Sequence, residues 1–455
     1  MTTEIDFEPW KLLGELAETG AVERLREEAE RLGPRECARA ISRLSRELQA
    51  KVLTALEPAA AADLMEEISE AQATGLITRL DTGTAAPILD AMASNTTADL
   101  LAQLPQHQVQ ALLREMQPEA AEDARLLVQY APEEAGGLMI REYLAYPVSY
   151  TTQQVIDDMR RNSEKYSEYS IQYSFVVSPE GKLVGVLPLR DLLLTPSNVA
   201  IERIMIRNPM RVSDRATLED LDAFFQERSF LGVPVVDDRD RLVGVVRRTD
   251  VDEALGKRAN KDYLKSQGIV GGEELRSMPT LVRSGRRLSW LSVNILLNVM
   301  AASVIAFYQD TLSSVIALAV FLPIISDMSG CSGNQAVAVS MRELALGLVK
   351  PFEVIHVWIK EAAVGMLNGL ALGLLIAMVA WLWKGNPFLG LVVGAALMLN
   401  TVVAVSIGGT LPLFLKRMKF DPALASGPIL TTVTDMCGFF FVLSLATVLL
   451  PYIQA

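Results

Sequence analysis

A single carboxylate lies in the middle of the last long apolar stretch of this chain. Between residues 423 and 450 the only charged side chain is Asp435, and a helix needs roughly 20 apolar residues to cross a bilayer. A carboxylate at the centre of a spanning helix costs about 2.5–3.5 kcal/mol on insertion scales and rarely faces lipid. Hydroxyl and small residues, Thr431 among them, recur beside it. We therefore interpret Asp435 as lining a cation pathway; the alternative is a protonated acid that hydrogen-bonds between helices.

A second apolar stretch, residues 311–348, also carries polar residues at membrane depth. Asp327, Asn334 and Gln335 occur there together with Pro323 and several glycines. We expect the backbone to be broken at this place, because such breaks persist where they are buried in protein or line a wet cavity. Freed carbonyls and the Asn334 amide would offer oxygen ligands to a cation or its water shell. The alternative is a kink whose small residues serve helix packing.

The elements that position these residues are five hydrophobic runs, approximately 288–308, 311–348, 354–383, 387–415 and 423–450. By rise per residue, Asp327 and Asp435 can share one depth in the membrane. Basic residues gather ahead of the first run, between the second and third, and between the fourth and fifth. The excess of positive charge on these loops predicts a cytoplasmic N-terminal part, five crossings and an external C-terminus.

Composition narrows the class of protein. The chain of 455 residues has a net charge of −12, so we expect no nucleic-acid partner. Its three cysteines, Cys37, Cys331 and Cys437, lie far apart and indicate neither a disulfide framework nor a zinc site. The acidic N-terminus is not typical of a signal peptide, and we expect the first 280 residues to stay in the cytoplasm.

The first 130 residues or so are rich in Ala, Leu and Glu, with helix-period apolar positions interrupted by capping residues and prolines. Breaks at Pro58, Asp81, Pro105 and Pro118 delimit segments too short to be stable alone. They predict a stack of short helices. Its acids form a solvated face by default, although a few could meet a divalent cation at an interface.

An internal repeat follows. Phe175-Val-Val with Gly185 and Asp191 recurs as Pro234-Val-Val with Gly244 and Asp250, and each copy is preceded by an amphipathic segment, 152–161 or 218–227. The order strand, helix, strand, strand, helix in tandem resembles a pair of CBS motifs. Such pairs often bind adenine nucleotides through a Ser or Thr placed three residues before the Asp. Pro188 and Arg247 occupy those positions here, which makes nucleotide binding doubtful.

As a whole, the chain resembles the MgtE family of magnesium transporters and channels. The resemblance is carried by the segment Tyr130-Ala-Pro-Glu-Glu-Ala-Gly-Gly-Leu-Met, by Gly333-Asn-Gln with Arg342-Glu-Leu-Ala-Leu, by Asp421-Pro-Ala-Leu-Ala-Ser-Gly-Pro, and by Thr434-Asp-Met-Cys-Gly. It implies a homodimer in the lipid bilayer, a pore between the subunits lined by the second and fifth membrane helices, and Mg²⁺ carried inward. It makes Asp435 the residue that recognises the ion. Asp327 departs from the family, in which its position is usually small and neutral. We expect Asp327, Asn334, Thr431 and Asp421 as further metal-site residues.

The same resemblance implies that cytosolic Mg²⁺ binds between the helical domain, the CBS pair and a connecting helix, and closes the pore. The regulatory acids that survive by alignment are Glu219, Asp250, Glu253, Asp262 and Asp421. The connecting helix departs from the family where Arg258 and Lys261 replace positions that are often acidic, and we hypothesise that Mg²⁺ closes this pore weakly or not at all. Cys331 and Cys437 also depart from the family, and their sulfurs could admit softer ions such as Co²⁺ or Zn²⁺.

We therefore predict a multidomain membrane protein that is not an enzyme. Its parts are an N-terminal α-helical superhelical domain (1–135), two CBS motifs (136–198 and 199–256), a connecting, plug-like helix (257–286) and a five-helix transmembrane pore domain (287–455). The predicted function is Mg²⁺ transport into the cytoplasm across the cell membrane, with the cytosolic domains as sensor. Two alternatives rank lower: an intramembrane aspartyl protease using Asp327 and Asp435, and a membrane-tethered CBS sensor whose helices only anchor it.

Overall fold

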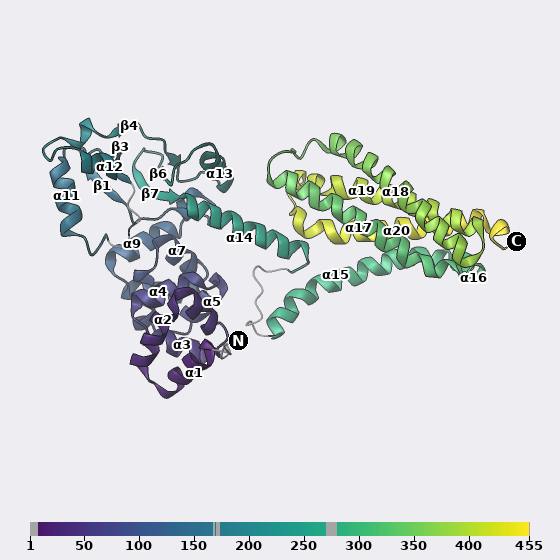
Figure 1. Ribbon diagram of the computed structural model, residues 1–455, viewed down its shortest axis with the longest axis horizontal. Coiled ribbons are helices and arrows are strands. Elements are labelled where there is room, and N and C mark those ends of the chain that lie inside the picture. Colours follow the sequence, from purple (N-terminus) through teal and green to yellow (C-terminus); the bar gives the residue numbers. More distant parts are fainter. Residues whose placement is uncertain (1–7, 167–168, 170–172, 270–279, 455) are drawn as a thin grey trace, which may run out of the picture. The chain divides into compact units, whose positions relative to one another are not determined.

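Two units make up the chain in the computed structural model, residues 1–257 and residues 258–455 (Figure 1). The structure describes residues 8–166, 169, 173–269 and 280–454. The first unit joins a stack of short helices to two small β-sheets, and the second unit is helical.

Short helices form the N-terminal stack of the first unit. Each helix contacts the next but one, so that the even-numbered and the odd-numbered helices form two packed rows. Apolar side chains between the rows, such as Leu53, Leu64 and Leu89, are almost wholly buried. The helices are α1 (Pro9–Thr19), α2 (Val22–Ile41), α3 (Arg46–Ala55), α4 (Pro58–Glu67), α5 (Glu70–Ile77), α6 (Thr82–Ala91), α7 (Ser94–Ala102), α8 (Gln106–Glu115), α9 (Pro118–Leu127) and α10 (Ala135–Leu138).

The predicted breaks between these helices are confirmed. Pro58 and Pro118 are first-turn residues of α4 and α9, where a missing backbone N–H costs nothing. The Asp81 side chain caps α6 by accepting from the N–H of Thr84, and Pro105 directly precedes α8. Since each helix is stopped by its own sequence, stability comes from packing between the rows.

The tandem repeat forms two β-sheets with the same pairing pattern. In the first, β1 (Leu144–Pro147) runs parallel to β2 (Tyr173–Val177), which pairs antiparallel with β3 (Leu183–Pro188), and β4 (Ile206–Arg207) adds to β3. In the second, β5 (Val212–Ser213) runs parallel to β6 (Gly232–Val236), which pairs antiparallel with β7 (Leu242–Arg247). Val176 opposes Gly185 in one sheet, and Val235 opposes Gly244 in the other. The repeat therefore folds twice into one register.

The helices of the repeat also occur as predicted. α11 (Thr152–Arg161) and α13 (Leu218–Glu227) each begin with a capping box, at Thr151 and at Thr217. α12 (Leu189–Leu194) and the 3₁₀ turn η1 (Ile201–Arg203) follow the first strand pair. α14 (Arg248–Ser266) follows the second pair and continues without interruption into the expected connecting helix. Residues 270–279 of that expected segment lie outside the described residues.

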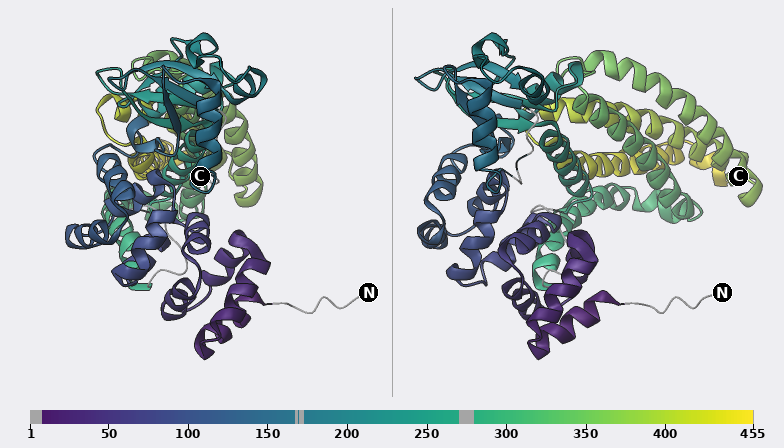
Figure 2. Two further views of the ribbon diagram at one scale, coloured as in Figure 1. Left: turned by 90° about the vertical axis from the view of Figure 1, so that its left-hand side faces the viewer. Right: turned by 60° about the vertical axis from the view of Figure 1, so that its left-hand side comes forward.

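The second unit contains five long helices in its described part, and α19 lies among them. α17 (Leu318–Ala345), α18 (Val354–Lys384) and α20 (Pro422–Val448) each pack against α19 (Pro387–Arg417), while α15 (Thr280–Phe307) packs against α20; Figure 2 shows these helices running alongside one another. Two short helices, α16 (Gln309–Ser314) and α21 (Leu450–Gln454), lie after α15 and α20. By length and composition, four helices of the described part could cross a membrane: α15, α18, α19 and the part of α20 from Gly427.

Glycines allow α18 and α19 to approach closely. A Cβ placed on Gly369 would lie 2.8 Å from the carbonyl oxygen of Met398, and one on Gly373 would lie 2.6 Å from that of Gly394. Both distances are too short for a side chain, so the two backbones are in direct contact. Such contacts hold α19 in a fixed position, which matters because α19 borders the site described next.

Candidate functional site

The Asp435 carboxylate lies where α20 meets α17. Only 9% of Asp435 is exposed, and its Oδ1 accepts a hydrogen bond from the Ser326 hydroxyl of α17. Among the residues that the structure describes, Asp435 forms no ion pair. An acid held in this way is neither turned to lipid nor neutralised by a basic side chain, and it remains available to a cation.

Hydroxyl groups surround this acid on both helices. Thr434 and Ser329 are fully buried, and their hydroxyls bond to carbonyls of their own helices, at 2.9 Å and 2.8 Å. Thr431, one turn before Asp435, is exposed and donates to the Gly427 carbonyl at 3.0 Å. Polar side chains therefore gather around Asp435, whereas the same two helices also contribute apolar residues such as Phe321 and Leu443 to a common core.

The other predicted residues of α17 lie on its exposed face. Asp327, Cys331 and Asn334 follow one another at helical spacing, and all three are exposed. We call these three residues the polar stripe of α17. Because Ser326 bonds to Asp435, the neighbouring Asp327 lies within one residue of the level of Asp435, as the rise per residue predicts. The stripe points away from the protomer's own core, so Asp327 and Asn334 do not join Asp435 in a single cluster.

The expected backbone break in this segment is wrong. α17 is one continuous helix from Leu318 to Ala345, with Pro323 inside its first turns. The glycines serve close packing instead: a Cβ on Gly333 would lie 3.0 Å from the Ala404 carbonyl oxygen, and one on Gly408 would lie 2.2 Å from the Gly333 carbonyl oxygen. Carbonyls within a regular helix are bonded to N–H groups, so the ligands on α17 are its side chains.

Asp421, the remaining predicted residue of the second unit, has a structural role at the start of α20. Its carboxylate accepts from the N–H of Ala423 at 3.0 Å and caps the helix. The Lys265 ammonium of α14 lies 2.5 Å from the same carboxylate, and it is 4.0 Å from Asp262. Asp421 therefore lies beside a cation that the chain itself supplies, and far along α20 from Asp435.

Two of the regulatory acids of the first unit, Asp250 and Glu253, are likewise close to basic side chains. Asp250 accepts two hydrogen bonds from the Arg247 guanidinium, at 2.8 Å and 2.7 Å. Glu253 pairs with Lys257 at 2.8 Å. Glu219 is exposed in the first turn of α13. Arg247 also occupies the sequence position at which we expect a hydroxyl residue in nucleotide-binding CBS pairs. Its guanidinium donates both of these hydrogen bonds to the Asp250 carboxylate.

Lys257 is part of a larger charged cluster between α5, α7 and α14. The pKa of Asp99 is raised to about 7, chiefly by burial and then by the charge of Glu70; Lys257 lowers the pKa and Glu253 raises it. The pKa of Lys257 is itself raised by its bond to Glu253 and by the charges of Glu70 and Asp99, against the effect of burial. One ammonium therefore interacts electrostatically with three acidic side chains.

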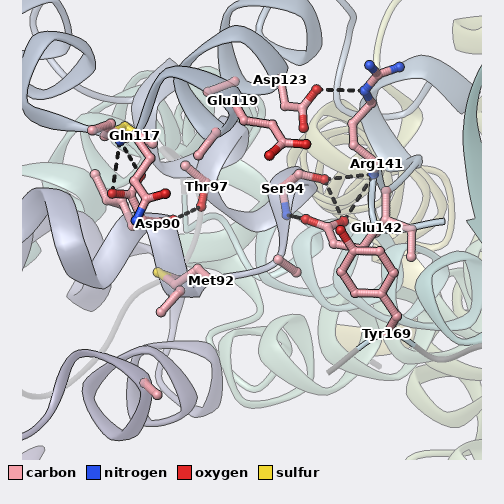
Figure 3. A pocket seen from close by; sticks show the side chains of 18 of the residues that line it. Asp90, Met92, Ser94, Thr97, Gln117, Glu119, Asp123, Arg141, Glu142 and Tyr169 are labelled. Carbon is pink, nitrogen blue, oxygen red and sulfur yellow. Dashed lines mark hydrogen bonds and ion pairs between the residues drawn. The ribbon is translucent and has the colours of Figure 1, made fainter. Parts of the chain in front are cut away.

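A cleft of about 650 Å³ opens between the helical stack and the residues that follow α10 (Figure 3). Arg141 bridges it: Nε bonds to Asp123 of α9 at 2.8 Å, and a guanidinium nitrogen donates to the Val243 carbonyl of β7 at 2.6 Å. Beside it, Glu142 accepts from the hydroxyl and the N–H of Ser94, at 2.9 Å and 3.0 Å. The acids lining the cleft are Asp63, Glu66, Asp90, Glu119, Asp123 and Glu142, and its cations are Arg141, Lys165 and Arg247.

We tested whether these acids could hold a regulatory Mg²⁺. Within the described ranges, no group of three or more His, Cys, Asp or Glu side chains is arranged to hold a metal. Three of the acids that the family resemblance selects, Asp250, Glu253 and Asp421, lie beside Arg247, Lys257 and Lys265. A dication at these acids would have to compete with cations of the chain itself, which weakens its binding there.

Sequence reasoning missed four functional candidates: Ser326, Asn400, Lys257 and Lys265. Asn400 could have been found, because it is an isolated amide within the apolar run 387–415. The other three acquire their roles only through contacts with residues distant in sequence.

Comparison with known proteins agrees with this organisation. Residues 322–445 match the family model for a divalent cation transporter, MgtE; residues 32–133 match the MgtE intracellular N domain; and residues 135–197 and 201–257 match CBS domains. The curated magnesium transporter MgtE of Bacillus subtilis is 30% identical over 336 residues, and that of Thermus thermophilus is 32% identical over 343 residues. The alignment spans 74% of both chains in each case.

Solved structures also resemble part of this chain. A structure described as the cytosolic domain of the Mg²⁺ channel MgtE in complex with ATP is 29% identical, with a TM-score of 0.49, and the match covers 53% of this chain and 98% of that one. The soluble part of a magnesium transporter is 24% identical, also with a TM-score of 0.49, over 55% of this chain and 98% of that one. Identity of at least 30% across most of two curated relatives shows the family: this chain belongs to the MgtE family of magnesium transporters.

Proposed function

We propose that this protein carries Mg²⁺ into the cytoplasm, through a pore that two copies of the chain form in the cell membrane. The observation that carries the proposal is that a buried acid on α20 lies near an exposed polar stripe on the neighbouring helix α17. Asp435 lies between α20 and α17, and the stripe Asp327, Cys331 and Asn334 lies on the outer face of α17. A carboxylate and an amide exposed at membrane depth need water or protein beside them, because lipid cannot hydrogen-bond with them.

A second copy related by a two-fold axis would supply that cover. In such a dimer the same patch meets itself, so two stripes would face one another across the axis. Two or four carboxylates with amide and hydroxyl oxygens suit Mg²⁺, which keeps most of its waters and is bound through few carboxylates. Asp435 recognises the hydrated ion, Asp327 and Asn334 line the path, and Thr431 adds a hydroxyl one turn before Asp435 on α20.

The finer division of the chain belongs to this proposal. The helical domain (1–135), the CBS motifs (136–198 and 199–256) and the connecting helix (257–286) are cytoplasmic, and the pore domain (287–455) ends outside. The cytoplasmic domains act as a sensor only weakly responsive to Mg²⁺, because Arg247, Lys257 and Lys265 already pair with Asp250, Glu253 and Asp421. The Arg247–Asp250 pair likewise disfavours adenine nucleotide at the second CBS motif.

Cargo uptake tests the main proposal. Purified full-length protein in liposomes that contain a Mg²⁺-sensitive dye should take up Mg²⁺, and Asp435→Ala should abolish uptake and growth rescue of a transport-deficient host. Asp327→Asn should change ion preference or rate with normal expression. Normal rescue by Asp435→Ala would refute the role of this acid, and unchanged preference in Asp327→Asn would reduce Asp327 to a structural residue.

A second candidate cargo is a softer divalent ion such as Co²⁺ or Zn²⁺. The observation in its favour is that Cys331 is exposed in the middle of the polar stripe instead of packed in the core. Cys331→Ser should then weaken Co²⁺ uptake more than Mg²⁺ uptake in the same liposomes. An equal effect on both ions would exclude a role of the sulfur in ion choice.

A further inference from the structure

Asn400 is a fully buried amide with no hydrogen-bond partner. It lies in α19, its exposed fraction is 0%, and neither Oδ1 nor Nδ2 bonds to any described residue. Nearly all buried polar side chains in proteins are paired, and an unpaired one calls for an explanation. The neighbouring Thr401 is equally buried, but its hydroxyl bonds to the Leu397 carbonyl at 2.8 Å. The two adjacent residues are therefore equally buried, but only the Thr401 side chain has a hydrogen-bond partner.

Asn400 does not stabilise the observed conformation, so stability does not explain why an amide occupies this position. A buried amide without partners lowers stability, and an apolar side chain of similar shape, such as Leu, would be better tolerated there. Lipid and a second copy of the chain cannot reach Asn400 in this conformation, because no part of it is accessible. Its partner must be an internal water, or a group that approaches when the helices move.

The position of Asn400 identifies that group. Its Nδ2 lies 2.7 Å from the point where a Cβ on Gly438 would be, so the amide lies directly against α20. Gly438 is one helical turn from Asp435, on an adjoining face. The same Cβ position is 3.3 Å from Cγ2 of Ile325, the residue before Ser326. Asn400 thus borders the contact between α17 and α20 at the level where Ser326 holds Asp435.

We propose that Asn400 is a positioning residue for the transported cation, an inference that rests on the proposed function. When the Asp435 carboxylate turns from Ser326 to the hydrated ion, the Asn400 N–H₂ donates to that carboxylate, directly or through one water. The amide oxygen accepts a hydrogen bond from a water of the ion. Gly438 provides the space for this movement, since any side chain there would meet the amide.

The test compares Asn400→Leu with Thr401→Val in full-length protein. Each variant removes one polar group from adjacent, fully buried positions and keeps the number of side-chain heavy atoms, but only Asn400→Leu removes an unpaired group. Mg²⁺ uptake into dye-loaded liposomes gives the half-saturating concentration and the maximal rate, and melting in detergent gives the stability. For Asn400→Leu we expect an unchanged or higher melting temperature and a half-saturating Mg²⁺ concentration raised about tenfold or more. The maximal rate should change less, and Thr401→Val should retain wild-type half-saturation.

Each other outcome has a definite meaning. Wild-type half-saturation in Asn400→Leu would overturn the inference while the proposed function stands. A melting temperature below that of Thr401→Val would also overturn it, because the amide would then have a structural partner. Absence of uptake by wild-type liposomes would refute the proposed function, and this inference would fall with it.

Discussion

Replacing Gly408 by alanine tests how closely α17 and α19 must approach. A Cβ on Gly408 would lie 2.2 Å from the carbonyl oxygen of Gly333, 3.0 Å from its carbonyl carbon and 3.2 Å from Cβ of Ala336. Two of these three atoms are backbone, and the third is the short side chain of an alanine, so none can rotate away. To restore ordinary contact, α17 must move away from α19 by about 1 Å.

The expected loss of stability follows from two opposing effects. Overpacking a tightly packed contact costs about 1–3 kcal/mol. Alanine is more favourable than glycine within a helix by up to about 1 kcal/mol, which offsets part of this loss of stability. We therefore expect Gly408→Ala to destabilise the protein by about 1–2 kcal/mol. Gly330→Ala in α17 is the matched control, because its Cβ would meet only the Thr434 hydroxyl, at 4.0 Å; it should be neutral or stabilising.

The measurement is melting in detergent, with Mg²⁺ uptake as the functional readout. Since α17 carries Ser326, a shift of this helix should also weaken its hydrogen bond to Asp435 and lower uptake. The reasoning would be refuted if Gly408→Ala melted with the wild type, or if Gly330→Ala lost as much stability as Gly408→Ala.

Three further predictions concern charged groups outside the membrane helices. The pKa of Asp99 is raised from 3.8 to about 7, so between these pH values the folded chain keeps a proton that the unfolded chain loses. Stability should therefore fall as pH rises from about 4 through 7. Asp99→Asn should raise the melting temperature at pH 8 and flatten the dependence of melting temperature on pH. Arg141→Met should cost about 2 kcal/mol, from its bonds to Asp123 and Val243, in urea unfolding followed by protease susceptibility; a cost near zero would contradict the bridging role. Mg²⁺ should protect the wild-type protein little in limited proteolysis, and it should protect Lys265→Gln more, because this variant removes the ammonium beside Asp421. Strong protection of the wild type, or equal protection of both proteins, would contradict the idea that basic side chains of the chain compete with Mg²⁺.

Sequence alone predicted those parts of the fold whose causes are local. The helices α11 and α13 begin at Thr152 and Leu218, as predicted, because each is preceded by a capping threonine. The two sheets followed from a repeated pattern of strands. The break expected in α17 failed, since glycines and a proline in sequence do not reveal whether a neighbouring helix lies against them. Contacts such as that of Ser326 with Asp435 join segments remote in sequence, and no local pattern encodes them.

The two faces of α17 give the strongest structural reason to expect a second copy of the chain. One face, which includes Ile325, Ser329, Gly333, Ala336 and Ser340, is buried against its own protomer, whereas the polar stripe occupies the other.

α17 is as long as α15, but it is not among the described helices that are apolar enough to cross a membrane. Its polar residues are the reason. A helix in contact with both α19 and α20 cannot leave the bundle that the family places in the membrane. Its outer face must then meet something other than lipid, because Asp327 and Asn334 cannot be satisfied by hydrocarbon. A twin of the same face, with water and a hydrated cation between the two, satisfies both side chains at once, and cross-linking at Cys331 of one copy to Cys331 of another would be the direct sign of it. Failure of that cross-link in lipid, with a dimer present by mass, would place the interface elsewhere.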